Sequence, residues 1–99
     1  MIYLSGKITD KNPAKEKANI QRFKAKAGEL RLLGLQVFNP AEYEAKNFKW
    51  EDYLAKDIDW IYRKNPDTIY LMKGWENSLG ARLEKAVAEH KCMQIIYEA

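Results

Sequence analysis

Residues 67–97, DTIYLMKGWENSLGARLEKAVAEHKCMQIIY, decide the fold because they hold a strand, a loop, a helix and a second strand in succession. The apolar run DTIYLM at 67–72 is typical of a strand, and so is MQIIYE at 93–98. Between them, Leu79 to His90 carries the apolar spacing of a helix. Two strands joined by a helix need a crossover connection, and right-handed crossovers place such strands parallel in one sheet.

The same alternation of strands and helices extends back to the start of the chain. The predicted elements are, in order, a strand in residues 1–6, a helix from Pro13 to Leu33 that stops at Gly34, a strand in 35–40, a short helical turn after Pro40, and a second long helix that starts near Trp50 and breaks at 63–66. This order predicts a small Rossmann- or flavodoxin-like three-layer α/β sandwich. Its four-stranded parallel sheet should have the order 2-1-3-4.

The composition predicts one domain over residues 1–99, because 99 residues with 46% hydrophobic side chains fill a single core. A formal charge of +3, spread along the chain, gives no indication of a nucleic-acid polymer as partner. One cysteine, Cys92, is too few for a disulfide framework or a zinc site, and we expect its thiol to be buried. Without a leader or a long apolar stretch, the chain is expected to be cytoplasmic, with no membrane partner.

The predicted strand order reverses between the first and third strands, and open α/β sheets bind ligands beyond the strand ends at such a point. Glycine lets the backbone approach a ligand closely, and the N–H groups that start a helix attract anions. The candidate binding residues at these strand ends are Ser5, Gly6, Lys7, Gly74, Trp75, Ser78 and Gly80. Alternatively, the glycines serve turn geometry and helix packing, and Ser78 is only a helix cap.

Two carboxylates, Asp57 and Glu84, are the candidate catalytic residues. Asp57 lies on the apolar stripe of the second long helix, where burial alone favours an aliphatic residue, and Glu84 lies about one turn after Gly80. Paired carboxylates in one pocket suit chemistry at an acetal-like carbon, with one as nucleophile and the other as acid, base or partner of the sugar. Alternatively, Glu84 is solvated and Asp57 pairs with Lys24 or Arg63.

Four segments, YLSGKI, DIDWI, DTIYLM and SLGARLEKAVA, resemble the nucleoside 2-deoxyribosyltransferase superfamily in order and over nearly the whole chain. This superfamily includes a branch that hydrolyses the N-glycosidic bond of 2′-deoxynucleoside 5′-monophosphates. The chain is most similar to small, often phage-encoded members with a Gly-Trp-Glu-x-Ser-x-Gly-Ala-x-x-Glu loop, which is GWENSLGARLE at 74–84 here.

The resemblance implies roles for individual residues. Glu84 takes the place of the nucleophile that attacks the anomeric carbon, and Asp57 takes that of the aspartate that assists at the sugar and the leaving base. Tyr3 and Gly6 correspond to the tyrosine and glycine of the first strand, and Ser78 to the serine that contacts the 5′ end of the nucleotide. The turn GKITDKNP departs from the phosphate-binding turn of the hydrolases, because it holds fewer glycines and serines.

These observations predict an enzyme that acts on the N-glycosidic bond of a nucleoside or nucleotide, by transfer or hydrolysis, with no metal or other cofactor. Trp75 is expected either to form a flat wall for a base or to cover the core. The alternative functions are a module that binds a nucleotide or an NAD-derived ligand without turnover, and a structural protein with a vestigial pocket. Core packing is the default expectation for Trp50 and Trp60, which lie on the second long helix. A homodimer or larger homo-oligomer is expected, in contact through this helix with Trp50, Tyr53 and Trp60.

Overall fold

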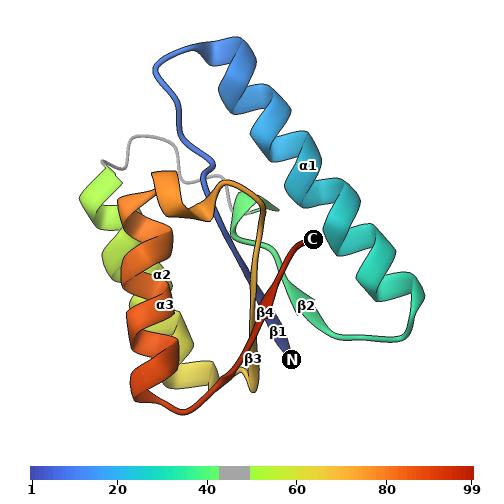
Figure 1. Cartoon of the computed structure of the whole chain (residues 1–99), viewed down its shortest axis with the longest axis vertical. Coiled ribbons are helices and arrows are strands. Elements are labelled where there is room, and N and C mark those ends of the chain that lie inside the picture. The colour runs from blue at the N-terminus through green and yellow to red at the C-terminus, as the bar shows by residue number, and fades with distance from the viewer. Residues whose placement is uncertain (43–49) are drawn as a thin grey trace.

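Short strands and longer helices alternate along the chain, as the apolar pattern predicts. The computed structural model describes residues 1–42 and 50–99, the side chains of residues 50–53 excepted. Its elements are β1 (Ile2–Ser5), α1 (Pro13–Leu32), β2 (Val37–Phe38), η1 (Pro40–Glu42), α2 (Trp50–Lys64), β3 (Thr68–Leu71), η2 (Trp75–Asn77), α3 (Leu79–His90) and β4 (Gln94–Tyr97). Figure 1 shows the sheet nearly edge on, with α1 on one side and α2 and α3 on the other.

The sheet has the predicted topology. All four strands are parallel and their order is β2-β1-β3-β4, which confirms the predicted order 2-1-3-4. Ser5 lies opposite Leu71, and the N–H of Met72 donates to the carbonyl of Ser5 at 2.8 Å. The carboxyl ends of β1 and β3 therefore lie side by side, and the segments that begin at Gly6 and Gly74 leave the sheet at the same edge.

Local sequence explains both ends of α1. The Asn12 side chain accepts a hydrogen bond from the N–H of Ala14 at 2.9 Å, and Pro13 occupies the first helical position, where its missing N–H needs no partner. After the helix, Gly34 has a φ of 83°, in the left-handed region that glycine adopts without steric cost. The helix ends at Leu32, one residue earlier than the pattern predicts.

Alternate residues of β1 enter two cores, one on each face of the sheet. On one face, Leu4 packs with Phe23 of α1 and with Met72. On the other face, the buried residues are Tyr3, Phe38, Ile61, Ile69, Leu71 and Ala88. Because Tyr3 and Ser5 are two residues apart, they share the face that α2 and α3 cover.

Two expectations about local structure are wrong. Cys92 is exposed, because it lies in the turn after α3 with a φ of 57°, where its N–H donates to the carbonyl of Glu89 at 3.1 Å. The stretch 73–78, expected to be an open loop, contains the 3-10 turn η2, in which the N–H of Asn77 donates to Gly74 at 3.1 Å. Neither difference changes the topology.

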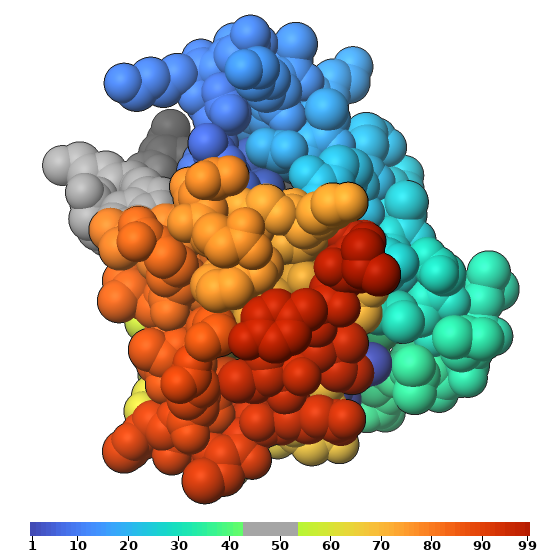
Figure 2. Space-filling model, viewed as in Figure 1, coloured from blue at the N-terminus to red at the C-terminus, as the bar shows by residue number. Residues whose placement is uncertain are grey.

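The outer surfaces of the helices carry exposed apolar side chains among polar ones, such as Leu32 of α1, Tyr62 of α2 and Leu83 of α3. α1 has 20 residues, and only Phe23 and Ala27 of them are buried. Figure 2 shows α1 and α3 flanking β4, which is an edge strand and lies at the surface of this face. No helix in the described residues is long and apolar enough to cross a membrane.

Gly6→Ala should lower the free energy of unfolding by roughly 1–3 kcal/mol, because it adds a carbon to a packed site. A Cβ atom at Gly6 would lie 2.8 Å from Cβ of Met72 and 3.2 Å from the ring of Phe23. Gly28→Ala is the matched control, because it lies inside α1 with nothing within 4 Å of the added carbon. This control should gain about 0.5–1 kcal/mol. Urea denaturation measures both, and similar effects of the two variants would contradict the packing role of Gly6.

Candidate active site

Glu84 is buried between α3 and β1 and is only 6% exposed. Its Oε2 accepts a hydrogen bond from the Tyr3 hydroxyl at 2.6 Å, and its Oε1 accepts one from the Ser5 hydroxyl at 2.7 Å. These donors replace the water that a carboxyl group loses on burial. The alternative of a solvated Glu84 is therefore wrong.

Two periodicities bring these three residues together. On β1, Tyr3 and Ser5 share one face because side chains alternate along a strand. On α3, the buried residues are Ala81, Glu84 and Ala88, which are three and four positions apart and so lie on one side of the helix. The small alanine side chains before and after Glu84 let the helix lie close to the sheet, within hydrogen-bond reach of β1.

Asp57 is the second carboxyl group of the site. It is half-buried on α2, and its charge acts on Glu84. Neither expected cation pairs with it: Nε of Arg63 contacts Oδ2 of Asp59 at 2.8 Å, and Lys24 lies on α1, which covers the opposite face of the sheet. The structure thus brings together the two carboxyl groups that the sequence singled out.

Burial raises the pKa of both carboxyl groups. Removal from water and then the charge of Asp57 raise the pKa of Glu84 to about 7, against the hydrogen bonds from Tyr3 and Ser5, which lower it. Removal from water raises the pKa of Asp57 to about 6, against the Tyr3 hydroxyl and the charge of Lys56. Burial and the two carboxylates hold the pKa of Tyr3 well above its usual value, so its hydroxyl stays a hydrogen-bond donor.

The segment that follows β3 starts α3 and so positions Glu84. Gly74 has a φ of 91°, and Oγ of Ser78 accepts a hydrogen bond from the N–H of Ala81 at 3.1 Å. Gly80 is half-buried in the first turn of α3. Turn geometry and helix capping therefore account for Gly74 and Ser78 without a ligand. A hydroxyl that accepts one hydrogen bond can still donate another, so the predicted contact of Ser78 with a ligand is compatible with its role as a cap.

Trp75 is half-buried and packs against the core on the face of the sheet that α2 and α3 cover. Its ring centroid is 5.9 Å from that of Tyr97, and Nζ of Lys85 lies 5.6 Å from its ring centroid. These contacts give Trp75 a packing role in the protein itself. Its expected role as a wall for a base stays a prediction.

Gly6 and Lys7 follow β1 at the same edge of the sheet. The close approach of Met72 and Phe23 accounts for glycine at position 6. Nζ of Lys7 lies 3.7 Å from Oδ2 of Asp10 in a partly exposed pair. Surface pairs of this kind are weak because solvent screens them, so a ligand anion would compete for Lys7 at little cost.

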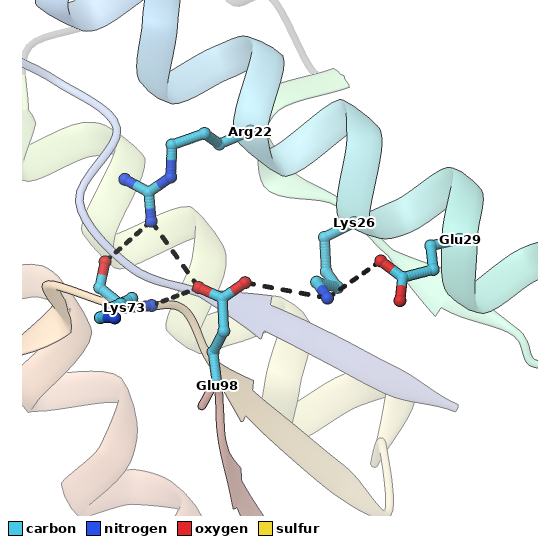
Figure 3. Close-up of polar contacts among 5 residues, drawn as sticks. All are labelled: Arg22, Lys26, Glu29, Lys73 and Glu98. Atoms are coloured by element: carbon cyan, nitrogen blue, oxygen red, sulfur yellow. Dashed lines mark hydrogen bonds and ion pairs between the residues drawn. The ribbon is translucent and has the colours of Figure 1, made fainter.

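A network of charged groups on the α1 side holds the start of the segment after β3 (Figure 3). The N–H of Lys73 donates to the Glu98 carboxylate at 2.7 Å, and the carbonyl of Lys73 accepts from Arg22 at 2.8 Å. Arg22 and Lys26 of α1 pair with Glu98 at 3.7 and 3.8 Å. Both polar groups of the Lys73 backbone are therefore fixed at the exit of β3.

Sequence reasoning missed the aromatic surroundings of Tyr3. Phe38 is its partner in the register of β1 and β2, with ring centroids 5.2 Å apart. Trp60 of α2 stacks on Phe38 with ring centroids 3.7 Å apart, which confirms the default expectation that it packs against the core. The predicted strand order could have indicated the contact between Phe38 and Tyr3, because it places the second strand beside the first. The side chains of Trp50 and Tyr53 lie outside the described residues.

The functional groups around Glu84 are carboxyl and hydroxyl groups. They can transfer protons, and a carboxylate among them can act as a nucleophile. Among the described side chains, those of residues 1–42 and 54–99, no three of His, Cys, Asp or Glu gather as metal ligands. A hollow of about 570 Å³ lies away from the carboxylates, beside α1 and the end of β2. It is lined by Ile20, Lys24, Asn39, Ala41 and Glu42.

The stability of the protein should fall as the pH rises from about 5 to about 7.5, because the folded protein keeps protons that the unfolded chain releases. A carboxyl group whose pKa is raised by folding stabilises the protein below its unfolded pKa. That contribution is lost as the pH passes the folded values, about 6 for Asp57 and about 7 for Glu84. The expected loss is on the order of a few kcal/mol.

Urea denaturation across this pH range measures the effect. Glu84→Gln should remove about half of the slope, because glutamine keeps the shape of the side chain without its ionisation while Asp57 keeps its own raised pKa. Glu89→Gln is the matched control on the same helix, where Glu89 is exposed and pairs with Lys85, and it should keep the slope. A stability of the unmodified protein that stays constant or rises over this range would contradict the raised pKa values.

Comparison with known proteins relates this arrangement to a family. The model of a family described as a domain of unknown function, DUF4406, matches residues 1–97, which include Tyr3, Ser5, Asp57 and Glu84. No curated protein and no solved structure matches the chain. Because the match covers nearly every residue, the protein belongs to the DUF4406 family.

Proposed function

We propose that the protein breaks the N-glycosidic bond of deoxynucleosides or deoxynucleoside 5′-monophosphates, with Glu84 as the nucleophile. The observation that carries the proposal is a buried carboxyl group held by two hydroxyl donors beside a second carboxyl group. This pair lies at the edge of a parallel sheet, at the point where the strand order reverses. Open α/β sheets bind ligands at such a point. The resemblance to the nucleoside 2-deoxyribosyltransferase superfamily assigns the same two residues to the reaction.

The proposed reaction has two steps. In the first, an oxygen of Glu84 forms a bond to C1′ of the sugar while the bond from C1′ to the base nitrogen breaks. The base leaves with the electron pair and takes a proton from Asp57 or from water; a pKa of about 6 suits Asp57 to this transfer near neutral pH. In the second, water or a second nucleobase attacks C1′ and gives its proton to the Asp57 carboxylate, while the bond from C1′ to Glu84 breaks and leaves Glu84 as a carboxylate.

The surrounding residues have roles that agree with this chemistry. The hydroxyls of Tyr3 and Ser5 hold Glu84 in one orientation, which positions the attacking oxygen. The Ser78 hydroxyl and the first N–H groups of α3 lie at the same edge of the sheet and are suited to the 5′ end of a nucleotide. Lys7 follows β1 at that edge and provides a positive charge.

A second candidate function is a module that binds a nucleotide or an NAD-derived ligand without turnover. The burial of Glu84 favours it, because a carboxyl group that is 6% exposed has little contact with solvent from which a substrate arrives. Its pKa of about 7 also leaves Glu84 half protonated at neutral pH, when a nucleophile must be ionised.

Release of free base separates the two candidates. We expect the protein to release base from one or more of the four common deoxynucleoside 5′-monophosphates or their nucleosides, as measured by chromatography. Glu84→Gln should lower the rate by a factor on the order of a thousand or more, because it removes the nucleophile. Glutamine is preferred to alanine here, because alanine would leave the buried hydroxyls of Tyr3 and Ser5 without their acceptor.

Glu89→Gln is again the control, and it should keep the rate of the unmodified protein. Isothermal titration calorimetry with the same compounds measures binding. Intact nucleotide bound without any release of base would support the binding module. Base release that is unchanged in Glu84→Gln would contradict the proposed mechanism, and neither binding nor release would contradict both candidates.

We also propose a homodimer or larger homo-oligomer that contacts through α2, supported by the small size of the domain and by Tyr62, which is 48% exposed on this helix. Light scattering at micromolar concentration should give at least twice the chain mass of 11.6 kDa. Tyr62→Glu should lower the measured mass, whereas Leu32→Glu, at the end of α1, should not. A monomeric mass for the unmodified protein would contradict the proposal.

A further inference from the structure

The ring of Tyr3 is enclosed by two other aromatic rings. Its centroid lies 5.2 Å from that of Phe38 and 5.8 Å from that of Trp60. Phe38 and Trp60 are themselves stacked, with centroids 3.7 Å apart. Tyr3 is 0% exposed, so these rings and the neighbouring core residues determine its orientation.

The orientation of this ring determines where its hydroxyl lies. The hydroxyl is at the far end of a rigid ring, so a small tilt near Cβ moves the oxygen much further than it moves the ring carbons. The bond from this oxygen to Oε2 of Glu84 is 2.6 Å long. Functional groups need to be held to within about 0.5 Å, which a loosely packed ring does not provide.

The three rings come from three different elements. Tyr3 belongs to β1, Phe38 to β2 and Trp60 to α2, and Trp60 is the half-buried member at the outside of the stack. Backbone pairing fixes the positions of Tyr3 and Phe38 relative to each other, because they are partners in the parallel register. Trp60 is the member that closes the stack from the helix side.

We propose that Trp60 is a positioning residue, which holds the Tyr3 ring through the stack with Phe38 and so keeps the Tyr3 hydroxyl on the Glu84 carboxylate. Its effect on turnover rests on the proposed function. Its effect on the ionisation of Glu84 does not, because the Tyr3 hydroxyl lowers the pKa of Glu84 in the free protein. A tryptophan that only filled space would stabilise the core without acting on Glu84.

The test measures the pKa of the Glu84 carboxyl group by carbon-13 NMR titration of the full chain with labelled glutamate. The Glu84 signal is assigned by its absence from the spectrum of Glu84→Gln. Trp60→Leu should raise this pKa, because the hydrogen bond from Tyr3 to Glu84 is lost or lengthened; the other charged group that acts on Glu84 is Asp57, which the Tyr3 hydroxyl also faces. Tyr3→Phe should raise it similarly. In the double variant the two effects should not add, because both act through the same hydroxyl.

Three further variants complete the experiment. Trp60→Phe keeps an aromatic ring on Phe38 and should keep a pKa close to that of the unmodified protein. Trp60→Met, which fills space without a ring, replaces Trp60→Leu if that variant does not fold, and it should raise the pKa in the same way. Tyr70→Leu is the control: Tyr70 is half-buried and packs against the core on the α1 side of the sheet, so its removal should leave the pKa of Glu84 unchanged.

The outcomes separate this proposal from the proposed function. An unchanged or lowered pKa in Trp60→Leu, or a rise that persists in full in the Tyr3→Phe background, would overturn the positioning role whether or not the protein releases base. If the protein does release base, Trp60→Leu should lower kcat more than it changes KM and should move the pH profile upward by the same amount as the NMR titration. Absence of base release with the expected titration would overturn the proposed function alone.

Discussion

Glu84 gives up nearly all of its hydration to lie against β1, and two hydroxyl groups of that strand replace the water. An unpaired carboxyl group at this depth would cost several kcal/mol, so Tyr3 and Ser5 are as necessary to the fold as they are to the site. The same bonds fix the position of α3 over the sheet. The segment between β3 and α3 is then held from both ends, by α3 and by the network around Lys73.

The two carboxyl groups ionise with difficulty in the free protein, and this explains how the site would favour a reaction. At neutral pH Asp57 is largely ionised and Glu84 is half ionised, because burial and mutual repulsion oppose the second charge. A sugar that develops positive charge at C1′ would relieve that repulsion. The interaction would therefore be stronger in the transition state than with the neutral substrate, which is the requirement for catalysis.

Packing and helix capping account for the identity of several residues that a search for binding motifs alone would describe as ligand contacts. Gly6 leaves room for Met72 and Phe23, and Ser78 caps α3. Trp75 lies against Tyr97. These structural roles do not exclude contact with a ligand, because the residues lie at the edge of the sheet where the strand order reverses. In a chain of 99 residues, Gly6, Ser78 and Trp75 each have a structural role, and the contacts proposed for them with a ligand would be additional to it.

The sequence by itself determined the order and kind of the elements, the strand order 2-1-3-4, the bounds of α3 from Leu79 to His90, and the choice of Asp57 and Glu84 as a pair. The elements depend on periodicity and on local signals for helix ends, which lie within a few residues of each other. The pair of carboxyl groups depends also on the resemblance of the motifs around them to the nucleoside 2-deoxyribosyltransferase superfamily. Only the tertiary structure decided that Glu84 is buried, that Tyr3 and Ser5 hold it, and that Phe38 is the residue on which Trp60 packs. Tyr3 and Ser5 are 81 and 79 positions from Glu84, so their contacts depend on how closely a helix lies on a strand, which no local pattern specifies.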